Sequence, residues 1–122
     1  MYSIKDASDI TNVSSYTLRY YEKEEILFPK RDIQGNRIYS ENDIKWIKFV
    51  IRLKNSQIPI SKIKEYTRLF KEGKHTSSQR LSILEEQQQN ILHQLELLQI
   101  INKELDYKIK NYKEILKKAN LK

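Results

Sequence analysis

The chain has 122 residues, of which 39% are hydrophobic and 32% are charged, and its formal net charge at pH 7 is +7. It contains no cysteine, which excludes disulfides, thiolate metal sites and thiol redox switches. The excess of positive charge favours a polyanionic partner, either nucleic acid or an acidic membrane surface. With only 2 glycines and 2 prolines, few residues interrupt helices, so a mainly α protein is expected.

Two short helices joined by a turn are predicted at the N-terminus. Ser3, followed three residues later by Asp6, has the pattern of a capping box that opens the first helix. Ser14 is a good N-cap for a second helix that runs from about Ser15 to Lys23. Two short helices joined by about four residues form a helix-turn-helix candidate.

The second predicted helix has a face of polar side chains that is not required for packing on a protein core. Residues three and four positions apart share a face of a helix. By this rule one polar face is formed by Tyr16, Arg19, Tyr20 and Lys23. Leu18 and Tyr21 point elsewhere and can anchor the helix on the core. Tyrosine hydroxyls can donate to phosphate oxygens and arginine can fork to phosphate or guanine, so this is a candidate recognition helix for a major groove. Ser15 and Thr17, near the helix N-terminus, complete the candidate contacts.

Residues 30–39, KRDIQGNRIY, are predicted to form a basic hairpin, with Gln34, Gly35 and Asn36 as turn residues. A basic hairpin beside a recognition helix acts as a wing that contacts the adjacent backbone or minor groove. Its candidate DNA-binding residues are Lys30, Arg31, Arg37 and Tyr39. Most of the excess positive charge lies before residue 78, as nucleic-acid binding by this part of the chain requires.

Two further helices complete the N-terminal module. A capping box at Ser40 and Asp43 opens a third helix over about residues 41–54. Pro59 marks the start of a fourth helix, which Gly73 closes as a C-cap. These elements predict one winged helix-turn-helix domain.

A long helix with a heptad repeat is predicted to follow. Thr76, with Gln79 three residues on, is expected to cap it, and neither glycine nor proline comes after. Apolar residues recur at alternating spacings of three and four over about five heptads, which is a strong coiled-coil signal. The seam is formed by Leu81, Leu84, Gln88, Ile91, Leu95, Leu98, Asn102, Leu105, Ile109, Tyr112 and Leu116. Since a small module alone cannot bury such a seam, a homodimer is expected.

The predicted organisation is therefore a DNA-binding domain over residues 1–75 and a coiled-coil dimerisation helix over residues 76–122. Gln88 and Asn102 lie on the seam, where polar residues either fix register and strand number or contact solvent at a frayed seam. Apolar residues also lie off the seam, so part of this helix is expected to pack against something else, such as the partner's N-terminal module.

Residues 1 to about 72 resemble the N-terminal domain of MerR-family transcription regulators, on the motifs TLRYYEK and RIYSENDI in this order. The stretch KWIKFVIRLKNSQIPISKIKEYTRLFKEG is similar to the aldehyde- and electrophile-responsive branch of that family. The resemblance implies a winged-helix dimer, formed through an antiparallel coiled coil, that binds a near-palindromic operator. It also implies action with RNA polymerase at promoters whose elements are overspaced, by bending and untwisting the DNA.

The chain departs from the family that it resembles at several positions. Arg52 matches the position of a cysteine that the electrophile-responsive branch often carries in its third helix, so a thiol sensor is absent. Glu25 and Gln57 stand where the family usually has helix-terminating glycines, and each is mildly strained if its backbone is left-handed. The cysteines of metal-sensing relatives are also missing, and neither a metal nor a cofactor is expected.

Other functions agree less well with the features of the sequence. An enzyme is not expected, because the sequence has no glycine-rich phosphate loop and its 2 histidines are not spaced as metal ligands. An architectural DNA-bending protein of the excisionase type would carry a similar module but not the long heptad repeat. A protein-interaction coiled coil with a degenerate DNA module is disfavoured because Arg19, Tyr20, Arg37 and Tyr39 are all present.

The sequence does not predict export or membrane insertion. The first ten residues, MYSIKDASDI, hold no apolar run of signal-peptide length, and no stretch approaches the roughly 20 apolar residues of a membrane span. A cytoplasmic protein without a membrane partner is expected.

Overall fold

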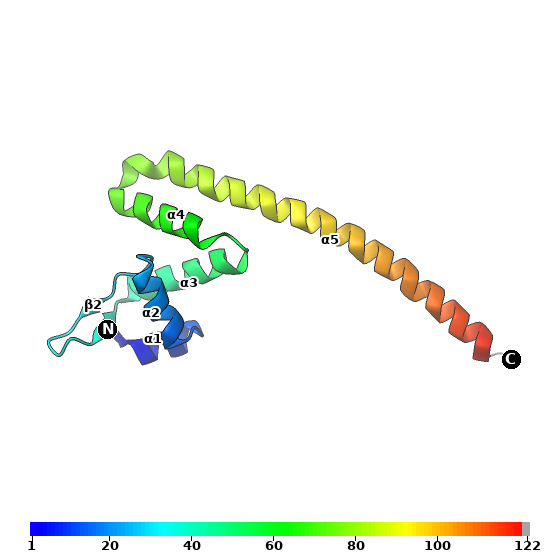
Figure 1. Ribbon diagram of the computed structural model, residues 1–122, viewed down its shortest axis with the longest axis horizontal. Helices are drawn as coiled ribbons and strands as arrows, with labels where there is room; N and C mark the ends of the chain where they lie inside the picture. Colours follow the sequence, from blue (N-terminus) through cyan, green and yellow to red (C-terminus); the bar gives the residue numbers. More distant parts are fainter. Residues whose placement is uncertain (121–122) are drawn as a thin grey trace. The chain divides into compact units, whose positions relative to one another are not determined.

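The computed structural model describes residues 1–120, and the chain divides into two compact units, Met1–Leu84 and Glu85–Lys122. The first unit holds short strands and packed helices, and the second is the continuation of one long helix (Figure 1). The expected mainly α architecture, with an N-terminal helix-turn-helix and a long C-terminal helix, is confirmed.

The two helices of the helix-turn-helix are α1, Ile4–Thr11, and α2, Ser15–Lys23. Their N-caps are the predicted serines: the Ser3 hydroxyl accepts a hydrogen bond from the Asp6 N–H at 3.1 Å, and the Ser14 hydroxyl accepts one from the Thr17 N–H at 3.0 Å. Each bond satisfies a donor that the first turn of a helix leaves without an intrahelical partner. The predicted start and end of α2 are confirmed.

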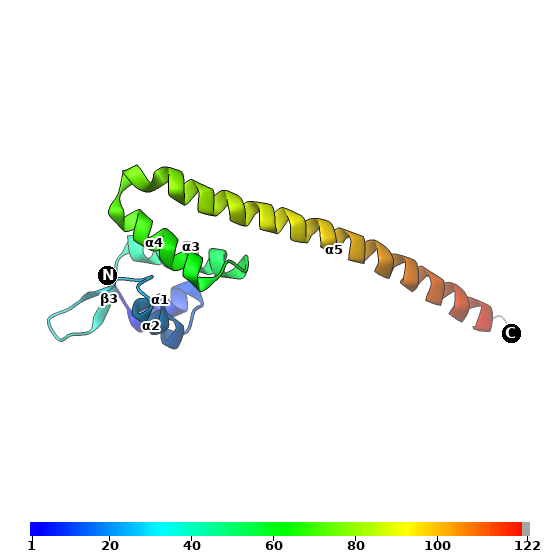
Figure 2. The ribbon, with the colours of Figure 1, turned by 45° about the horizontal axis from the view of Figure 1, so that its top comes forward.

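A small antiparallel sheet accompanies these helices. Its strands are β1, Tyr2–Ser3, β2, Lys30–Arg31, and β3, Arg37–Tyr39, and the strand order is β1-β3-β2. The hairpin of β2 and β3 confirms the predicted wing, and it projects beyond the helices in two views of the first unit (Figures 1 and 2). β1 was not predicted, because two residues are too few to show an alternating pattern.

The remaining helices of the first unit are α3, Glu41–Asn55, and α4, Ile60–Glu72. The predicted capping box of Ser40 and Asp43 opens α3 with both of its reciprocal bonds, at 3.1 and 2.8 Å. Glu25 and Gln57 have positive φ angles of 60° and 69°, so both non-glycine residues hold the left-handed conformation. Each therefore carries the mild backbone strain that the sequence analysis predicts for a left-handed residue at these positions.

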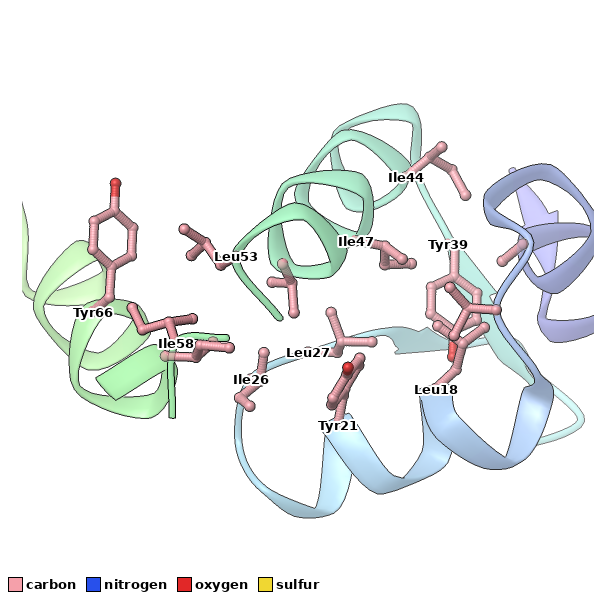
Figure 3. Packing of buried hydrophobic residues seen from close by; sticks show 14 of the residues in the cluster. Leu18, Tyr21, Ile26, Leu27, Tyr39, Ile44, Ile47, Leu53, Ile58 and Tyr66 are labelled. Atoms are coloured by element: carbon pink, nitrogen blue, oxygen red, sulfur yellow. The ribbon is translucent and has the colours of Figure 1, made fainter. Parts of the chain in front are cut away.

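The core of the first unit joins α2 to the wing and to α3. Leu18 and Tyr21 project from α2 toward Ile47 of α3 and toward Tyr39 of β3 (Figure 3). The Trp46 indole N–H donates to the carbonyl oxygen of Ile26 at 2.8 Å, which ties α3 to the turn after α2. Full burial of a large apolar side chain stabilises the fold by roughly 1.5–3 kcal/mol, so these contacts hold α2 in place.

The junction before the long helix differs from the prediction. Lys74–Thr76 form a 3-10 turn, and α5 spans Ser77–Asn120. The Thr76 hydroxyl donates to the carbonyl oxygens of Leu69 and Gly73, both at 2.7 Å, so it closes the end of α4. The prediction that Thr76 caps α5 is therefore wrong.

The first turns of α5 belong to the first unit. Ile83 is only 8% exposed because it lies in the core of that unit, and Leu84 packs against the same core. Leu84 is therefore half-buried within its own chain and leaves less apolar surface for a partner than most other predicted seam residues.

Over residues 85–120, the described part of the second unit, no apolar side chain is buried. Its exposed large apolar side chains include seam and off-seam residues: Leu92, Leu95, Leu97, Leu98, Ile100, Ile101, Leu105, Tyr107, Ile109, Tyr112, Ile115 and Leu116. None of the helices in residues 1–120 combines the length and apolar composition that crossing a bilayer needs.

Candidate nucleic-acid interface

The α2 helix presents the predicted polar face to solvent. Tyr16 is 79% exposed and Tyr20 is 40% exposed, and Arg19 and Lys23 are exposed between and after them. On the opposite side Leu18 is fully buried. Because successive helical residues turn by about 100°, one helix can anchor itself on the core and still offer a continuous face of phenol and cationic groups.

The start of α2 holds two further candidate residues, Ser15 and Thr17, and both are half-buried. The Ser14 hydroxyl donates to Thr17 Oγ1 at 2.9 Å while it accepts from the Thr17 backbone N–H. The N-terminal end of a helix also favours anionic groups, as a phosphate contact here would require.

The wing places two exposed cations, Lys30 and Arg31, on β2. Arg37 on β3 is less accessible, with 25% of its side chain exposed. Its Nε–H donates to Glu22 Oε1 at 2.6 Å, and Arg31 Nη2 lies 3.2 Å from Glu22 Oε2. Both wing arginines therefore share one carboxylate of α2.

Glu22 is a member of the site that the sequence analysis missed. It lies three residues after Arg19, beside the polar face of α2. Its position in the sequence could have identified it, because an acidic side chain beside the predicted DNA-binding residues of α2 would repel phosphates. Such a side chain is expected to have a cationic partner.

Tyr39, which the sequence analysis places among the candidate DNA-binding residues, is buried in the chain without DNA. Only 1% of it is exposed. The reason is the position of β3 in the middle of the sheet: alternate side chains of a strand point to opposite faces, and Tyr39 belongs to the face that packs on the core. Its ring is directed toward α2, beside Leu18 (Figure 3).

The Tyr39 hydroxyl lies near the charged side chains of α2 and the wing, which are Glu22, Arg19, Arg31 and Arg37. Burial raises the pKa of this phenol above its ordinary value of 10.0 and the Glu22 carboxylate raises it further, whereas Arg37, Arg31 and Arg19 lower it. Within residues 1–120 the hydroxyl has no hydrogen-bond partner. The Tyr39 ring thus packs as an apolar group in the core, and its hydroxyl oxygen is buried without a hydrogen bond to any described residue.

A cleft of about 430 Å³ lies between the N-terminal residues, α2 and the wing. The cationic side chains that line it are Lys5, Arg19, Arg31 and Arg37. Asp32 is the acidic residue of the lining, and its Oδ1 accepts from the backbone N–H groups of Gln34 and Asn36 at 2.9 and 2.8 Å. The cleft therefore has an excess of positive charge, which suits phosphate oxygens.

Within the part of the chain that the structure describes, no group of three or more His, Asp or Glu side chains is placed to hold a metal ion. His75 and His93 are both exposed. The chemistry that the described surface offers is instead that of hydrogen-bond donors and fixed positive charge.

Comparison with known proteins agrees with this arrangement. The family of MerR HTH regulatory proteins matches residues 2–69, which include the whole helix-turn-helix and the wing. An uncharacterized HTH-type transcriptional regulator of Haemophilus influenzae is 33% identical over 115 residues, which are 93% of this chain and 84% of that relative.

Two solved structures extend the similarity along the chain. A MerR family transcriptional regulator from Listeria monocytogenes is 31% identical, with a TM-score of 0.88 over 99% of this chain and 98% of that one. HiNmlR, a MerR family regulator described as lacking the sensor domain and bound to promoter DNA, is 32% identical, with a TM-score of 0.85 over 93% of this chain and 90% of that one. This chain therefore belongs to the MerR family of helix-turn-helix regulatory proteins, and it is a DNA-binding regulator of transcription.

Proposed function

We propose that this regulator acts as a homodimer that binds a near-palindromic operator within a promoter, with α2 in the major groove and the β2–β3 wing on the adjacent backbone. The observation that carries the proposal is the two-sided α2 helix, whose buried residues fix it on the core while Tyr16, Arg19 and Tyr20 stay exposed beside a cationic cleft. A groove-reading helix needs this combination of firm anchoring and exposed donors.

Within this proposal the exposed residues have separate tasks. Arg19 is the residue we assign to base reading, because a guanidinium can fork to the O6 and N7 atoms of guanine. Tyr16, Tyr20 and Lys23 donate to phosphate oxygens and set the orientation of the helix, and Ser15 and Thr17 add contacts at its start. Lys30, Arg31 and Arg37 bring the wing to the backbone.

The exposed seam of α5 supports the homodimer. A contiguous apolar surface along a 44-residue helix is unusual in a monomer and marks a contact with another chain. In the antiparallel arrangement that the family resemblance implies, a positions face d positions, and a register that pairs Leu95 with Leu98 of the partner also pairs Leu81 with Tyr112. Gln88 and Asn102 lie on this seam, where they fix register.

Two copies related by a twofold axis present two recognition helices, so the operator is expected to be a near-palindrome. The promoter complex of HiNmlR supports promoter binding by similarity. Bending and untwisting of the promoter, in contact with RNA polymerase, completes the proposal and is taken from the family resemblance. Such a regulator acts where the DNA is, in the cytoplasm.

A footprint on the promoter region of its own gene tests the proposal. The purified chain should protect an inverted repeat whose half-sites lie about one helical turn of DNA, or a multiple of it, apart. Sedimentation of the complex should give two chains per operator duplex. A matched duplex with a scrambled repeat serves as the control. Protection of a single half-site by one chain, or equal binding to both duplexes, would contradict the proposal.

A further inference from the structure

Glu22 joins the recognition helix to the wing through two arginines. Its Oε1 accepts from Arg37 Nε at 2.6 Å, and its Oε2 lies 3.2 Å from Arg31 Nη2. The exposed fractions of the side chains are 22% for Glu22, 25% for Arg37 and 46% for Arg31. Because Glu22 and Arg37 are largely shielded from water, their pairing is screened less by salt than an ordinary surface ion pair.

The two arginines keep donors for a ligand. Arg37 uses its Nε–H for Glu22, and no contact within residues 1–120 engages its two terminal nitrogens. Arg31 uses Nη2 for Glu22, and its Nη1 reaches the carbonyl oxygen of Gly35 only at 3.4 Å. Both arginines line the cationic cleft. A guanidinium can therefore hold Glu22 on one side and a phosphate oxygen on another.

A carboxylate on a DNA-binding surface has two opposing effects. It repels phosphates, which lowers affinity for any DNA. It also orders two long side chains before DNA arrives, so that their rotamer entropy is not lost on binding. Since Glu22 lies on α2 and both of its partners lie on the wing, it further keeps the two DNA-contacting elements in one arrangement.

We propose that the second effect prevails, and that Glu22 is a positioning residue for operator binding: it presets Arg31 and Arg37 for backbone phosphates. The proposal rests on the proposed DNA interface of α2 and the wing. It assigns to an acidic side chain a contribution that favours binding to a polyanion, and the sign of the effect can be measured.

The test is Glu22→Gln, which keeps the length of the side chain and one acceptor oxygen but removes the charge. Titration of a fluorescent operator duplex should show affinity falling by roughly fivefold to tenfold, a range typical of a lost charge-assisted contact. Glu25→Gln is the matched control, because it removes an exposed carboxylate just beyond α2; it should leave affinity equal or slightly higher. Operator affinity of Glu22→Gln equal to or above that of the unaltered protein would overturn the proposal.

A double-mutant comparison separates positioning from repulsion. In a chain with Arg31→Ala and Arg37→Ala, Glu22 has no arginine of the wing to position, so Glu22→Gln should now raise affinity. Loss of affinity in that background as well would contradict a role through the arginines. If Glu22→Gln lowers the melting temperature strongly, Arg37→Lys replaces it: the charge stays, the Nε–H contact is lost, and operator affinity should still fall. Unchanged affinity for Arg37→Lys would overturn the proposal.

Arg19→Ala distinguishes this proposal from the proposed function. Weak binding by Arg19→Ala together with normal binding by Glu22→Gln would refute only the positioning role. Normal binding by both variants would refute the DNA interface itself.

Discussion

Tyr20 and Tyr21 are neighbours in α2 with ring centroids 5.9 Å apart, yet Tyr20 is 40% exposed and Tyr21 only 4%. Their rings lie side by side at the boundary between the core and the exposed face of α2. The pair shows how α2 divides its residues: Tyr21 helps to anchor the helix on the core, and Tyr20, which precedes it, stays exposed.

Tyr20→Phe should weaken operator binding without changing stability. The substitution removes only a hydroxyl at an exposed position, so the loss is that of one hydrogen bond, about 0.5–1.5 kcal/mol of binding free energy. Operator titration and thermal unfolding of the same preparation measure both quantities. An unchanged affinity would remove Tyr20 from the interface, and an early melt would make its hydroxyl a structural group.

Leu18→Ala should show the opposite behaviour. Because Leu18 is fully buried, truncation leaves a cavity and should lower the free energy of unfolding by roughly 2–5 kcal/mol. Tyr16→Ala, at a residue that is 79% exposed, is the control and should change stability by no more than about 0.5 kcal/mol. Urea unfolding followed by circular dichroism compares the two. Similar losses in both variants would mean that Tyr16 is not a surface residue.

Tyr39→Phe should leave operator affinity unchanged, since Tyr39 is buried. It should not lower stability at neutral pH, because the hydroxyl that it removes is buried without a hydrogen-bond partner among the described residues. A fall in operator affinity at unchanged stability would instead show that Tyr39 contributes to DNA binding.

The same variant should resist alkali better than the unaltered protein. Burial raises the pKa of Tyr39 in the folded chain, so above the ordinary value of 10.0 the unfolded chain releases this proton while the folded chain still holds it. Stability contributed by the neutral phenol is therefore present below about pH 10 and is lost as pH rises through the folded pKa. The stability difference between Tyr39→Phe and the unaltered chain should grow between about pH 9 and pH 11. Parallel curves of unfolding free energy against pH would contradict this.

Leu95→Asp combined with Leu98→Asp should give monomers with poor operator affinity. Both leucines lie on the seam, and buried carboxylates would face each other across the dimer. Glu96→Gln, at an exposed polar position off the seam in the same helix turn, is the control and should keep the dimer. Sedimentation at several concentrations reports the association state. A dimer that survives the double substitution would show that the seam is not the dimer contact.

The helices could be predicted closely because their ends are encoded locally. Ser14 and the Ser40–Asp43 pair indicate the starts of α2 and α3 within four residues of sequence, and both helices begin there in the structure. The exception is Thr76, whose hydroxyl bonds backward to Leu69 and Gly73. A threonine before a helix has the same sequence pattern whether its hydroxyl accepts from the next turn or donates to the previous one.

The site could be predicted where helical periodicity decides which side chains are exposed, and not where distant segments meet. The α2 face followed from spacing alone, and the burial of Leu18 and Tyr21 is confirmed. Tyr39 lies in a strand of three residues, too short for alternation to identify the buried face. The contact of Glu22 with Arg37 joins residues fifteen positions apart on different elements, and such pairing depends on the tertiary fold.

The most direct test of the account is the behaviour of Arg19→Ala in two assays on one preparation. We expect thermal unfolding like that of the unaltered chain, because an exposed helical arginine contributes little to stability. Operator affinity should fall by roughly 1–3 kcal/mol, as expected for a guanidinium that forks to a base, with less effect on a scrambled duplex. An early melt with normal operator binding would mean that the exposed face of α2 is structural and that the DNA is bound elsewhere.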